Sequence, residues 1–335
     1  MSTNKNFHLK KRKEPSVEQI LAGIQSGDRY LLAQGITWLE SKKPQHRVKA
    51  HQLINQALQQ PKKSIRIGIT GVPGVGKSTF IESFGTTLAD AGHQVAVLTI
   101  DPSSQMSKGS ILGDKTRMET LSVHPSVFIR PSPSGDSLGG VAQTTKESIL
   151  LCEAAGFDVV IVETVGVGQS ETEVHSMVDF FMLLMLPGAG DELQGIKRGI
   201  MEMADLIVIN KADGQNEKKA RLAQKQLAAA LHYFPPNPNG WTTPVMTCSA
   251  LKHEGISELW DKAQDFLTQV QENNHFENRR GQQSLQWFRQ SLTEKLKSRF
   301  LDEPKVQERI KDLEKAIVQG QVSPFYAADQ LLDEI

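Results

Sequence analysis

The chain has 335 residues, of which 39% are hydrophobic and 23% are charged, as is ordinary for a folded protein with a substantial core. Its 38 lysines and arginines equal its 38 aspartates and glutamates, so no overall charge favours nucleic acid or an anionic membrane as a partner. The two cysteines, Cys152 and Cys248, stand far apart without metal-ligand spacing, which predicts reduced thiols. We expect a cytoplasmic protein without nucleic-acid or membrane partners.

The N-terminus and the most apolar run both argue against membrane targeting. The basic residues 10–13 are not followed by the apolar segment that a secretory signal requires. Residues 180–186 form the most apolar run, but they are far fewer than the roughly 20 residues of a spanning helix, and Pro187 follows them. This run therefore predicts a buried strand.

The pattern of apolar residues divides the chain into three regions. Residues 1–61 carry apolar side chains at helical spacing, which predicts an N-terminal helical extension that ends at Pro61. In residues 62–273 short β-branched runs alternate with longer helical stretches, as is typical of an α/β fold with a mostly parallel central sheet covered on both faces. The predicted strands are 65–70, 95–100, 159–162, 180–186, 206–209 and 244–247.

The third region, residues 274–335, is helical throughout and is expected to lie outside the sheet domain. Its first apolar stripe consists of Leu285, Phe288, Leu292 and Leu296. Its second stripe consists of Val306, Ile310, Leu313 and Ile317. Gly320 marks a helix end, and Ser323 with Pro324 predicts the start of a short last helix. Either a second copy of the chain or the protein's own core could cover the first stripe.

A glycine-rich segment follows the first predicted strand and opens a helix, which is the context of a phosphate-binding loop. Its residues are Gly71, Val72, Pro73, Gly74, Val75, Gly76, Lys77, Ser78 and Thr79. The glycines allow successive backbone N–H groups to surround a β-phosphate at a helix N-terminus. Lys77 is expected to bridge the β- and γ-phosphates, and Ser78 to coordinate Mg²⁺. A glycine-rich turn with a fortuitous lysine is the alternative, and the full pattern disfavours it.

A second motif points to guanine as the base. Asn210, Lys211 and Asp213 follow the predicted strand 206–209 and resemble the NKxD motif of GTPases. The Asp213 carboxylate can accept hydrogen bonds from guanine N1–H and from its 2-amino group, which adenine does not offer. ATP would leave this carboxylate buried and unpaired, so GTP is the expected nucleotide.

A third motif ends the next predicted strand. Ser249, Ala250 and Leu251 match the loop whose backbone N–H meets guanine O6. Each of these short motifs could by itself be a surface loop. Their order after a phosphate loop, with each motif at the carboxyl end of a strand, favours a guanine nucleotide site.

The segment after the predicted strand 159–162 departs from the usual Asp-x-x-Gly of GTPases, because Glu163 replaces the aspartate. Glutamate can still hold Mg²⁺, directly or through water, and the Gly166 N–H can still reach the γ-phosphate. Val167 stands where many GTPases place a water-orienting glutamine, and Gln169 lies two residues further on. We therefore expect slow intrinsic hydrolysis.

Two more carboxylates fall where a metal-sensing switch is expected. Asp101 ends the second predicted strand and Asp114 lies in the segment 110–118. With Ser78 and Glu163 they are the predicted Mg²⁺ ligands. The alternatives are that Asp101 caps a turn with residues 102–104 and that Asp114 is a surface acid.

Taken together, five segments closely resemble the ArgK/MeaB-type G-protein chaperones, the bacterial relatives of the human methylmalonic aciduria type A protein. The resemblance extends from about residue 20 to the C-terminus. The five segments are residues 71–79, 101–104, 110–118, 163–171 and 210–213.

This resemblance implies a P-loop NTPase of the SIMIBI class that binds GTP or GDP with Mg²⁺, with an N-terminal helical extension. It also implies a C-terminal helical arm that forms a homodimer. The implied partner is an adenosylcobalamin-dependent acyl-CoA mutase, chiefly methylmalonyl-CoA mutase, whose cofactor loading the family gates and which it protects. A third switch is implied over residues 186–197, with Lys197 as a further catalytic candidate.

Two other functions are weighed against this one. A transport-linked ATPase for basic amino acids is disfavoured by the guanine-selecting Asp213 and by the lack of an apolar spanning segment. A nickel-inserting SIMIBI GTPase calls for a stretch rich in histidine or cysteine, whereas the nine histidines are scattered along the chain.

Overall fold

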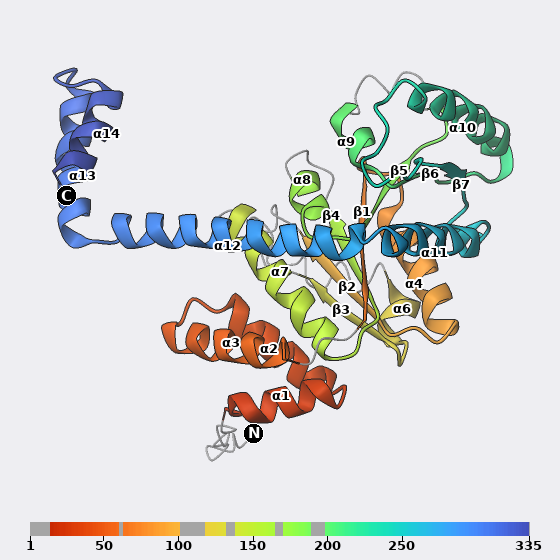
Figure 1. Cartoon of the computed structure of the whole chain (residues 1–335), viewed down its shortest axis with the longest axis horizontal. Helices are drawn as coiled ribbons and strands as arrows, with labels where there is room; N and C mark the ends of the chain where they lie inside the picture. Colours follow the sequence, from red (N-terminus) through yellow and green to blue (C-terminus); the bar gives the residue numbers. More distant parts are fainter. Residues whose placement is uncertain are drawn as a thin grey trace, which may run out of the picture. The chain divides into compact units, whose positions relative to one another are not determined.

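The computed structural model describes residues 14–59, 63–100, 118–131, 138–164, 170–188 and 198–334. The chain separates into two compact units, residues 1–277 and residues 278–335. The first unit holds a sheet and the helices that cover it, and the second consists of helices (Figure 1). No described helix is both long and apolar enough to cross a membrane.

A seven-stranded parallel sheet forms the centre of the first unit, with the strand order β3-β2-β4-β1-β5-β6-β7. In register, Ile67 of the central strand β1 stands opposite Ile161 and Phe180 on its two neighbours. Because all strands are parallel, their carboxyl ends meet at one edge of the sheet. The strands are β1 (Ile65–Gly71), β2 (Val95–Ile100), β3 (Val127–Pro131), β4 (Val159–Thr164), β5 (Phe180–Met185), β6 (Leu206–Ile209) and β7 (Val245–Thr247).

The predicted parallel sheet is confirmed, but the sequence pattern predicts six of its strands and misses β3. This strand has five residues at the edge of the sheet, and it includes Arg130 and Pro131. Proline cannot donate to a strand ladder, so it is tolerated at an edge, but its presence weakens the strand signal in the sequence. The fourth strand is longer than predicted and includes Glu163 and Thr164.

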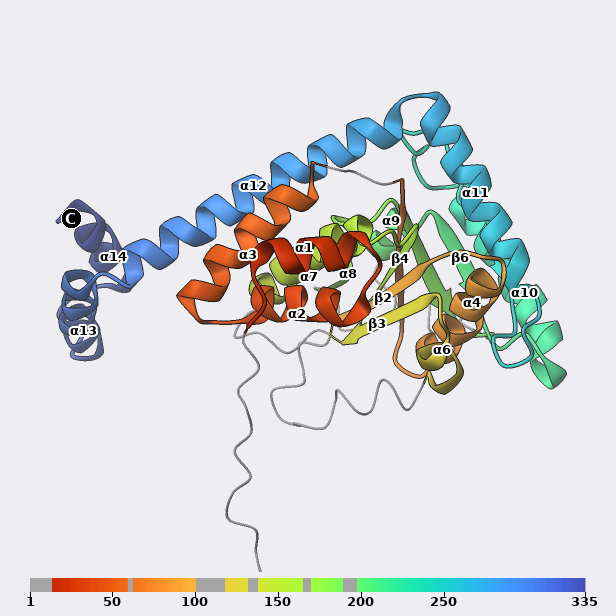
Figure 2. The ribbon, with the colours of Figure 1, turned by 90° about the horizontal axis from the view of Figure 1, so that it is seen from below.

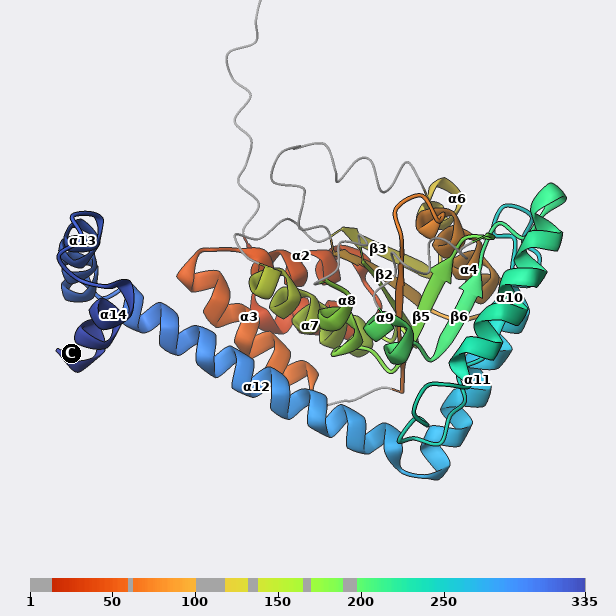
Figure 3. The same cartoon turned by 90° about the horizontal axis from the view of Figure 1, so that it is seen from above.

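Helices cover both faces of the sheet (Figures 2 and 3). Ile65, Ile67 and Ile69 of β1 point toward the first group of helices. That group is α4 (Lys77–Asp90), α6 (Glu119–Val123) and α11 (Ile256–Glu272). The second group is α7 (Leu138–Ala154), α8 (Ser170–His175), α9 (Arg198–Met203) and α10 (Glu217–Leu231), and the 3₁₀ turn η3 (Gly214–Asn216) precedes α10. Strands buried on both faces explain the continuous apolar runs.

Three N-terminal helices pack onto α7 and extend the second group. A Cβ on Gly35 would lie 3.4 Å from Cδ1 of Leu151, which shows how closely α2 approaches α7. Arg130 of β3 also forms a half-buried ion pair with Glu40 at the end of α2. Burial raises the pKa of the Glu40 carboxyl, and the Arg130 guanidinium opposes this effect. The three helices are α1 (Val17–Gln25), α2 (Arg29–Glu40) and α3 (Pro44–Ala57).

The second unit contains α12 (His275–Leu301) from Asn278 onward, followed by α13 (Pro304–Val318) and α14 (Pro324–Asp333). The Ser323 side chain accepts a hydrogen bond from the Tyr326 N–H, which confirms the predicted cap. Val306 and Leu313 of the second apolar stripe are buried. The first stripe is exposed, from 46% at Leu292 to 64% at Phe288. Its side chains therefore present an uncovered apolar surface.

Candidate functional site

The glycine-rich segment connects the end of β1 with the start of α4 at the carboxyl edge of the sheet. Gly74 and Gly76 have φ values of 82° and 93°, which side chains rarely adopt. A Cβ on Gly76 would also lie 3.1 Å from Nδ2 of Asn210. Glycine at these positions lets the backbone turn sharply into α4, whose first residues are Lys77, Ser78 and Thr79. The first turn of α4 thus offers N–H groups that can bind an anion.

Lys77 is held against the loop that precedes it. Its Nζ donates to the carbonyl of Gly71 at 2.8 Å and to that of Val72 at 3.4 Å. Burial lowers the pKa of Lys77, and the carboxylates of Glu163 and Glu171 act in the opposite direction. The lysine and two carboxylates therefore belong to one electrostatic group.

Asn210 joins the phosphate loop to the two base motifs. It follows β6, and its Nδ2 donates to the Val75 carbonyl at 3.0 Å. Its Oδ1 accepts hydrogen bonds from the Ala250 N–H at 3.1 Å and from the Cys248 thiol at 3.5 Å. Burial raises the pKa of Cys248 to about 12, so it stays a thiol and can donate. The structure thus brings together three motifs that are distant in the sequence.

Lys211 and Asp213 extend this group. Lys211 has a left-handed backbone with a φ of 59°, and its Nζ donates to the Gly74 carbonyl at 2.8 Å. The Ser249 hydroxyl donates to Oδ2 of Asp213, and the same hydroxyl oxygen accepts from the Lys252 N–H at 3.2 Å. Asp213 and Ser249 line a pocket of about 370 Å³. Leu251, the last residue of its motif, is 75% exposed at the loop tip.

Glu163 lies where β4 reaches the same edge of the sheet. Its side chain is 9% exposed, and its register partners are Ile69 of β1 and Thr99 of β2. The next residue, Thr164, donates its hydroxyl hydrogen to Oγ1 of Thr70 at 2.9 Å. These contacts fix the end of β4 beside the start of the phosphate loop. The oxygens of Glu163 and Ser78 are of the kind that Mg²⁺ prefers.

Several predicted site residues lie outside the described residues. They are Asp101, Asp114, Gly166 and Lys197. Among the described residues no group of three or more His, Cys, Asp or Glu side chains could hold a metal ion by itself.

Glu171 is a residue to which the sequence pattern assigns no role. A Cβ on Gly68 in β1 would lie 2.9 Å from Cγ1 of Val174 in α8. Glu171 is about one helical turn before Val174, toward the carboxyl end of β1. Its side chain is 4% exposed, and Oε2 has no hydrogen-bond partner. In the sequence, only its position eight residues after Glu163, in the segment 163–171, could have indicated a role for Glu171 in the site.

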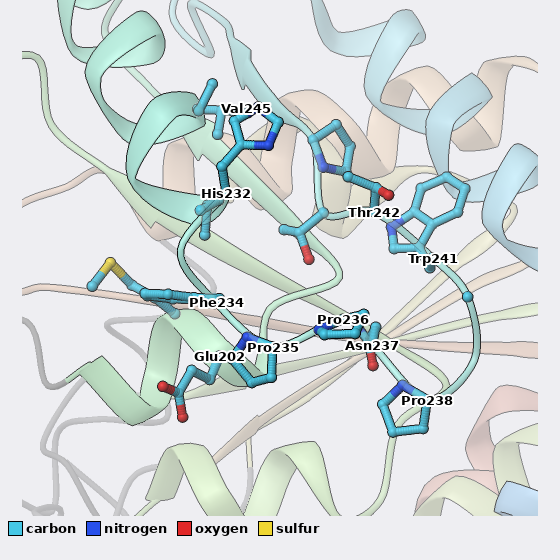
Figure 4. A pocket seen from close by; sticks show the side chains of 16 residues that line it. Glu202, His232, Phe234, Pro235, Pro236, Asn237, Pro238, Trp241, Thr242 and Val245 are labelled. Atoms are coloured by element: carbon cyan, nitrogen blue, oxygen red, sulfur yellow. The ribbon is translucent and has the colours of Figure 1, made fainter.

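A second pocket, of about 610 Å³, lies at the amino ends of the strands, away from the carboxyl ends where the phosphate loop lies. Figure 4 shows its lining residues. Its walls come from α9, from the end of α10 and from the loop that precedes β7, including Glu202, His232, Phe234 and Trp241. Because Val245 starts β7, this pocket is at the amino ends of the strands. It is larger than the pocket beside Asp213, but the phosphate loop is at the other edge.

Comparisons with known proteins show the family to which the chain belongs. A family model described as methylmalonyl Co-A mutase-associated GTPase MeaB matches residues 32–305. A probable GTPase of Mycobacterium tuberculosis is 46% identical over 320 residues, which cover 96% of this chain and 95% of the relative.

Two further relatives extend the comparison. The mitochondrial methylmalonic aciduria type A homolog of Mus musculus is 42% identical over 334 residues, which cover 97% of this chain and 80% of the relative. The solved structure of a protein named LAO/AO transport system kinase has a TM-score of 0.75 at 38% identity, and the match covers 96% of this chain and 98% of that one. The chain is therefore a P-loop GTP hydrolase that belongs to the MeaB family of GTPases.

Proposed function

We propose that the protein is a guanine-nucleotide switch that acts on a cobalamin-dependent acyl-CoA mutase. The observation that carries this proposal is the bonded group of Asn210, Asp213 and Ser249 beside the phosphate loop. Asp213 accepts guanine N1–H and the 2-amino group, a backbone N–H of the loop Ser249 to Leu251 meets guanine O6, and Lys211 lies along the base. Adenine offers neither donor to Asp213.

The base assignment predicts that GDP and GTP bind at least about tenfold more tightly than ADP and ATP, because covering the Asp213 carboxylate with a base that donates no hydrogen bonds to it costs more than about 1.4 kcal/mol. A competition titration against a fluorescent guanine nucleotide measures this ratio. Equal affinities for ADP and GDP would contradict the role of Asp213.

The same proposal assigns the phosphate and metal roles. Backbone N–H groups of Gly71 to Thr79 surround the phosphates, and Lys77 bridges the β- and γ-phosphates. Ser78 and Glu163 hold Mg²⁺, together with Asp101 and Asp114 from the sequence motifs. The metal, when bound, neutralises charge that develops on the transferred phosphoryl group. The Gly166 N–H meets the γ-phosphate, and Lys197 acts from the third switch.

The mutase partner is supported by the family description, which names methylmalonyl Co-A mutase, and by the methylmalonic aciduria type A relative. Loops that depend on the nucleotide, residues 103–117 and 186–197, form the contact surface in this proposal. A partner that reads these loops must favour one nucleotide state. By thermodynamic reciprocity its affinity then changes between GDP and GTP.

The mutase proposal is tested by the affinity of the protein for methylmalonyl-CoA mutase in the presence of GDP and of a non-hydrolysable GTP analogue. The two dissociation constants are expected to differ by at least about fivefold, a coupling of about 1 kcal/mol. Mutase binding that is identical in both states would remove the switch mechanism. The absence of mutase binding would remove the partner, while the GTPase assignment would remain.

The proposed domain boundaries follow the predicted regions, with a helical extension over residues 1–61, a GTPase domain over 62–273 and a dimerisation arm over 274–335. The exposed stripe of α12 supports a homodimer, because an uncovered apolar helix face is typical of protein contacts.

Leu292→Asp is expected to give a monomer by light scattering. Thr293→Asp, which adds the same charge at an exposed neighbour, is the matched control. A Leu292→Asp protein that is still dimeric would contradict the arm assignment.

A further inference from the structure

His253 lies in the loop that carries Ser249 and Ala250, here called the base loop and defined as residues 249–255. Main-chain hydrogen bonds of 3.0 and 3.1 Å between Ser249 and Glu254 close this loop. Gly255 then turns the chain into α11 with a φ of 75°. The base loop is therefore a short closed turn.

The backbone of His253 is unusual. Its φ is 57°, in the left-handed region, where a residue with a side chain is strained. Among the described residues that are not glycine, only Lys211, His253 and Asn274 have positive φ values of this kind. Two of these three belong to the groups that surround the proposed base. Such a backbone persists only where the surrounding contacts hold it, and these positions cluster at functional sites.

The His253 side chain is bonded to the helix that begins in the phosphate loop. Its Nδ1 lies 2.8 Å from Oγ of Ser83, and the tautomer of the ring decides which group donates. Ser83 is 1% exposed and lies in the second turn of α4, after Lys77 and Ser78. Because α4 is a continuous helix, this hydrogen bond connects the base loop to the phosphate-binding residues.

We propose that His253 is a positioning residue of the nucleotide site, which holds the backbone N–H groups of the base loop in place for guanine O6 by anchoring this loop to α4 through Ser83. Asn210 anchors the same loop from β6 through the Ala250 N–H, at 3.1 Å. Leu251, between the two anchors, is 75% exposed. His253 therefore fixes the part of the loop that Asn210 does not reach. The inference rests on the proposed guanine site.

Loss of the hydrogen bond between His253 and Ser83 is expected to weaken base recognition more than phosphate binding. A loosened base loop weakens the hydrogen bond to O6, a group that adenine lacks, while the phosphate loop still binds both nucleotides. In the full-length protein, His253→Ala is expected to weaken GDP binding about fivefold, the effect of one ordinary hydrogen bond. ADP binding is expected to stay within about twofold, so the GDP-to-ADP affinity ratio falls.

Three matched variants test the anchor. His253→Asn keeps a side-chain hydrogen-bonding group and tolerates a left-handed backbone, so it is expected to restore most of the affinity for GDP. Ser83→Ala removes the other partner and is expected to match His253→Ala. The double variant should lose no more than either single variant, because both remove the same bond. Thermal unfolding of each variant, measured without nucleotide, verifies that the protein is folded.

The outcomes separate this inference from the function on which it rests. Asp213→Asn should move the preference from GDP to xanthosine diphosphate. If it does, and His253→Ala leaves the GDP-to-ADP ratio unchanged or weakens both nucleotides equally, the positioning role is wrong. If Asp213→Asn leaves the base preference unchanged, the guanine site itself is wrong, and the positioning role is refuted with it.

Discussion

The two sides of the proposed nucleotide site differ in how their polar groups are bonded. On the base side, Asn210 bonds to Val75 and Ala250, and Ser249 bonds to Asp213. The metal side consists of Lys77, Ser78, Glu163 and Glu171. There Lys77 donates to main-chain carbonyls, and Oε2 of the buried Glu171 has no hydrogen-bond partner.

This difference indicates different tasks for the two sides. The side chains of the base side are already held in place, so they lose little conformational entropy when a nucleotide binds. The base side is therefore suited to set affinity and base specificity. A metal side with a buried carboxylate oxygen that has no hydrogen-bond partner, Oε2 of Glu171, responds strongly when a phosphate and its counter-ion arrive or leave. We therefore expect variants on the base side to change binding, and variants on the metal side to change turnover.

Glu163→Gln is the variant that separates the two sides most clearly. It keeps the shape of the side chain but removes the charge proposed to hold Mg²⁺, so turnover at saturating GTP is expected to fall at least about tenfold. The affinity for GDP is expected to change by less than about threefold. Turnover is measured by phosphate release, and GDP affinity by titration.

Asp213→Asn is the reciprocal control for Glu163→Gln. It should weaken GDP binding strongly while turnover at saturating GTP changes much less, because it acts at the base and not at the phosphates. If Glu163→Gln weakened GDP binding as much as it slowed turnover, the proposed division between the two sides would be lost.

The base side was predictable from the sequence because its residues form short contiguous motifs at the ends of apolar runs. Asn210, Lys211, Asp213 and Ser249 could each be named from their spacing after the phosphate loop. The parallel sheet followed from the same runs, except for β3, whose Arg130 and Pro131 obscure an edge strand.

The features that the sequence did not predict depend on contacts between distant segments. The hydrogen bond between His253 and Ser83 joins residues 170 positions apart in the sequence, and no local sequence pattern predicts it. The burial of Glu171 depends on how α8 packs against β1 and β4, whereas an acidic residue in the first turn of a helix is ordinarily an exposed one. Tertiary packing decided both features.

Glu171→Gln tests whether the buried charge of Glu171 lowers the stability of the nucleotide-free protein. A buried carboxylate with one unbonded oxygen is costly, and a neutral amide of the same shape costs less. The attraction of Glu171 for Lys77 acts in the opposite direction, but Lys77 also interacts with Glu163 and with two carbonyls. The nucleotide-free variant is therefore expected to be more stable by about 1 kcal/mol, with a Tm roughly 1–2 °C higher. Its affinity for GDP in the presence of Mg²⁺ is expected to fall about threefold, because removal of the Glu171 charge reduces the negative potential that attracts Mg²⁺. Calorimetry without nucleotide and GDP titration with and without Mg²⁺ measure the two effects. A variant that lost both stability and affinity would show that Glu171 is an ordinary structural partner of the fold.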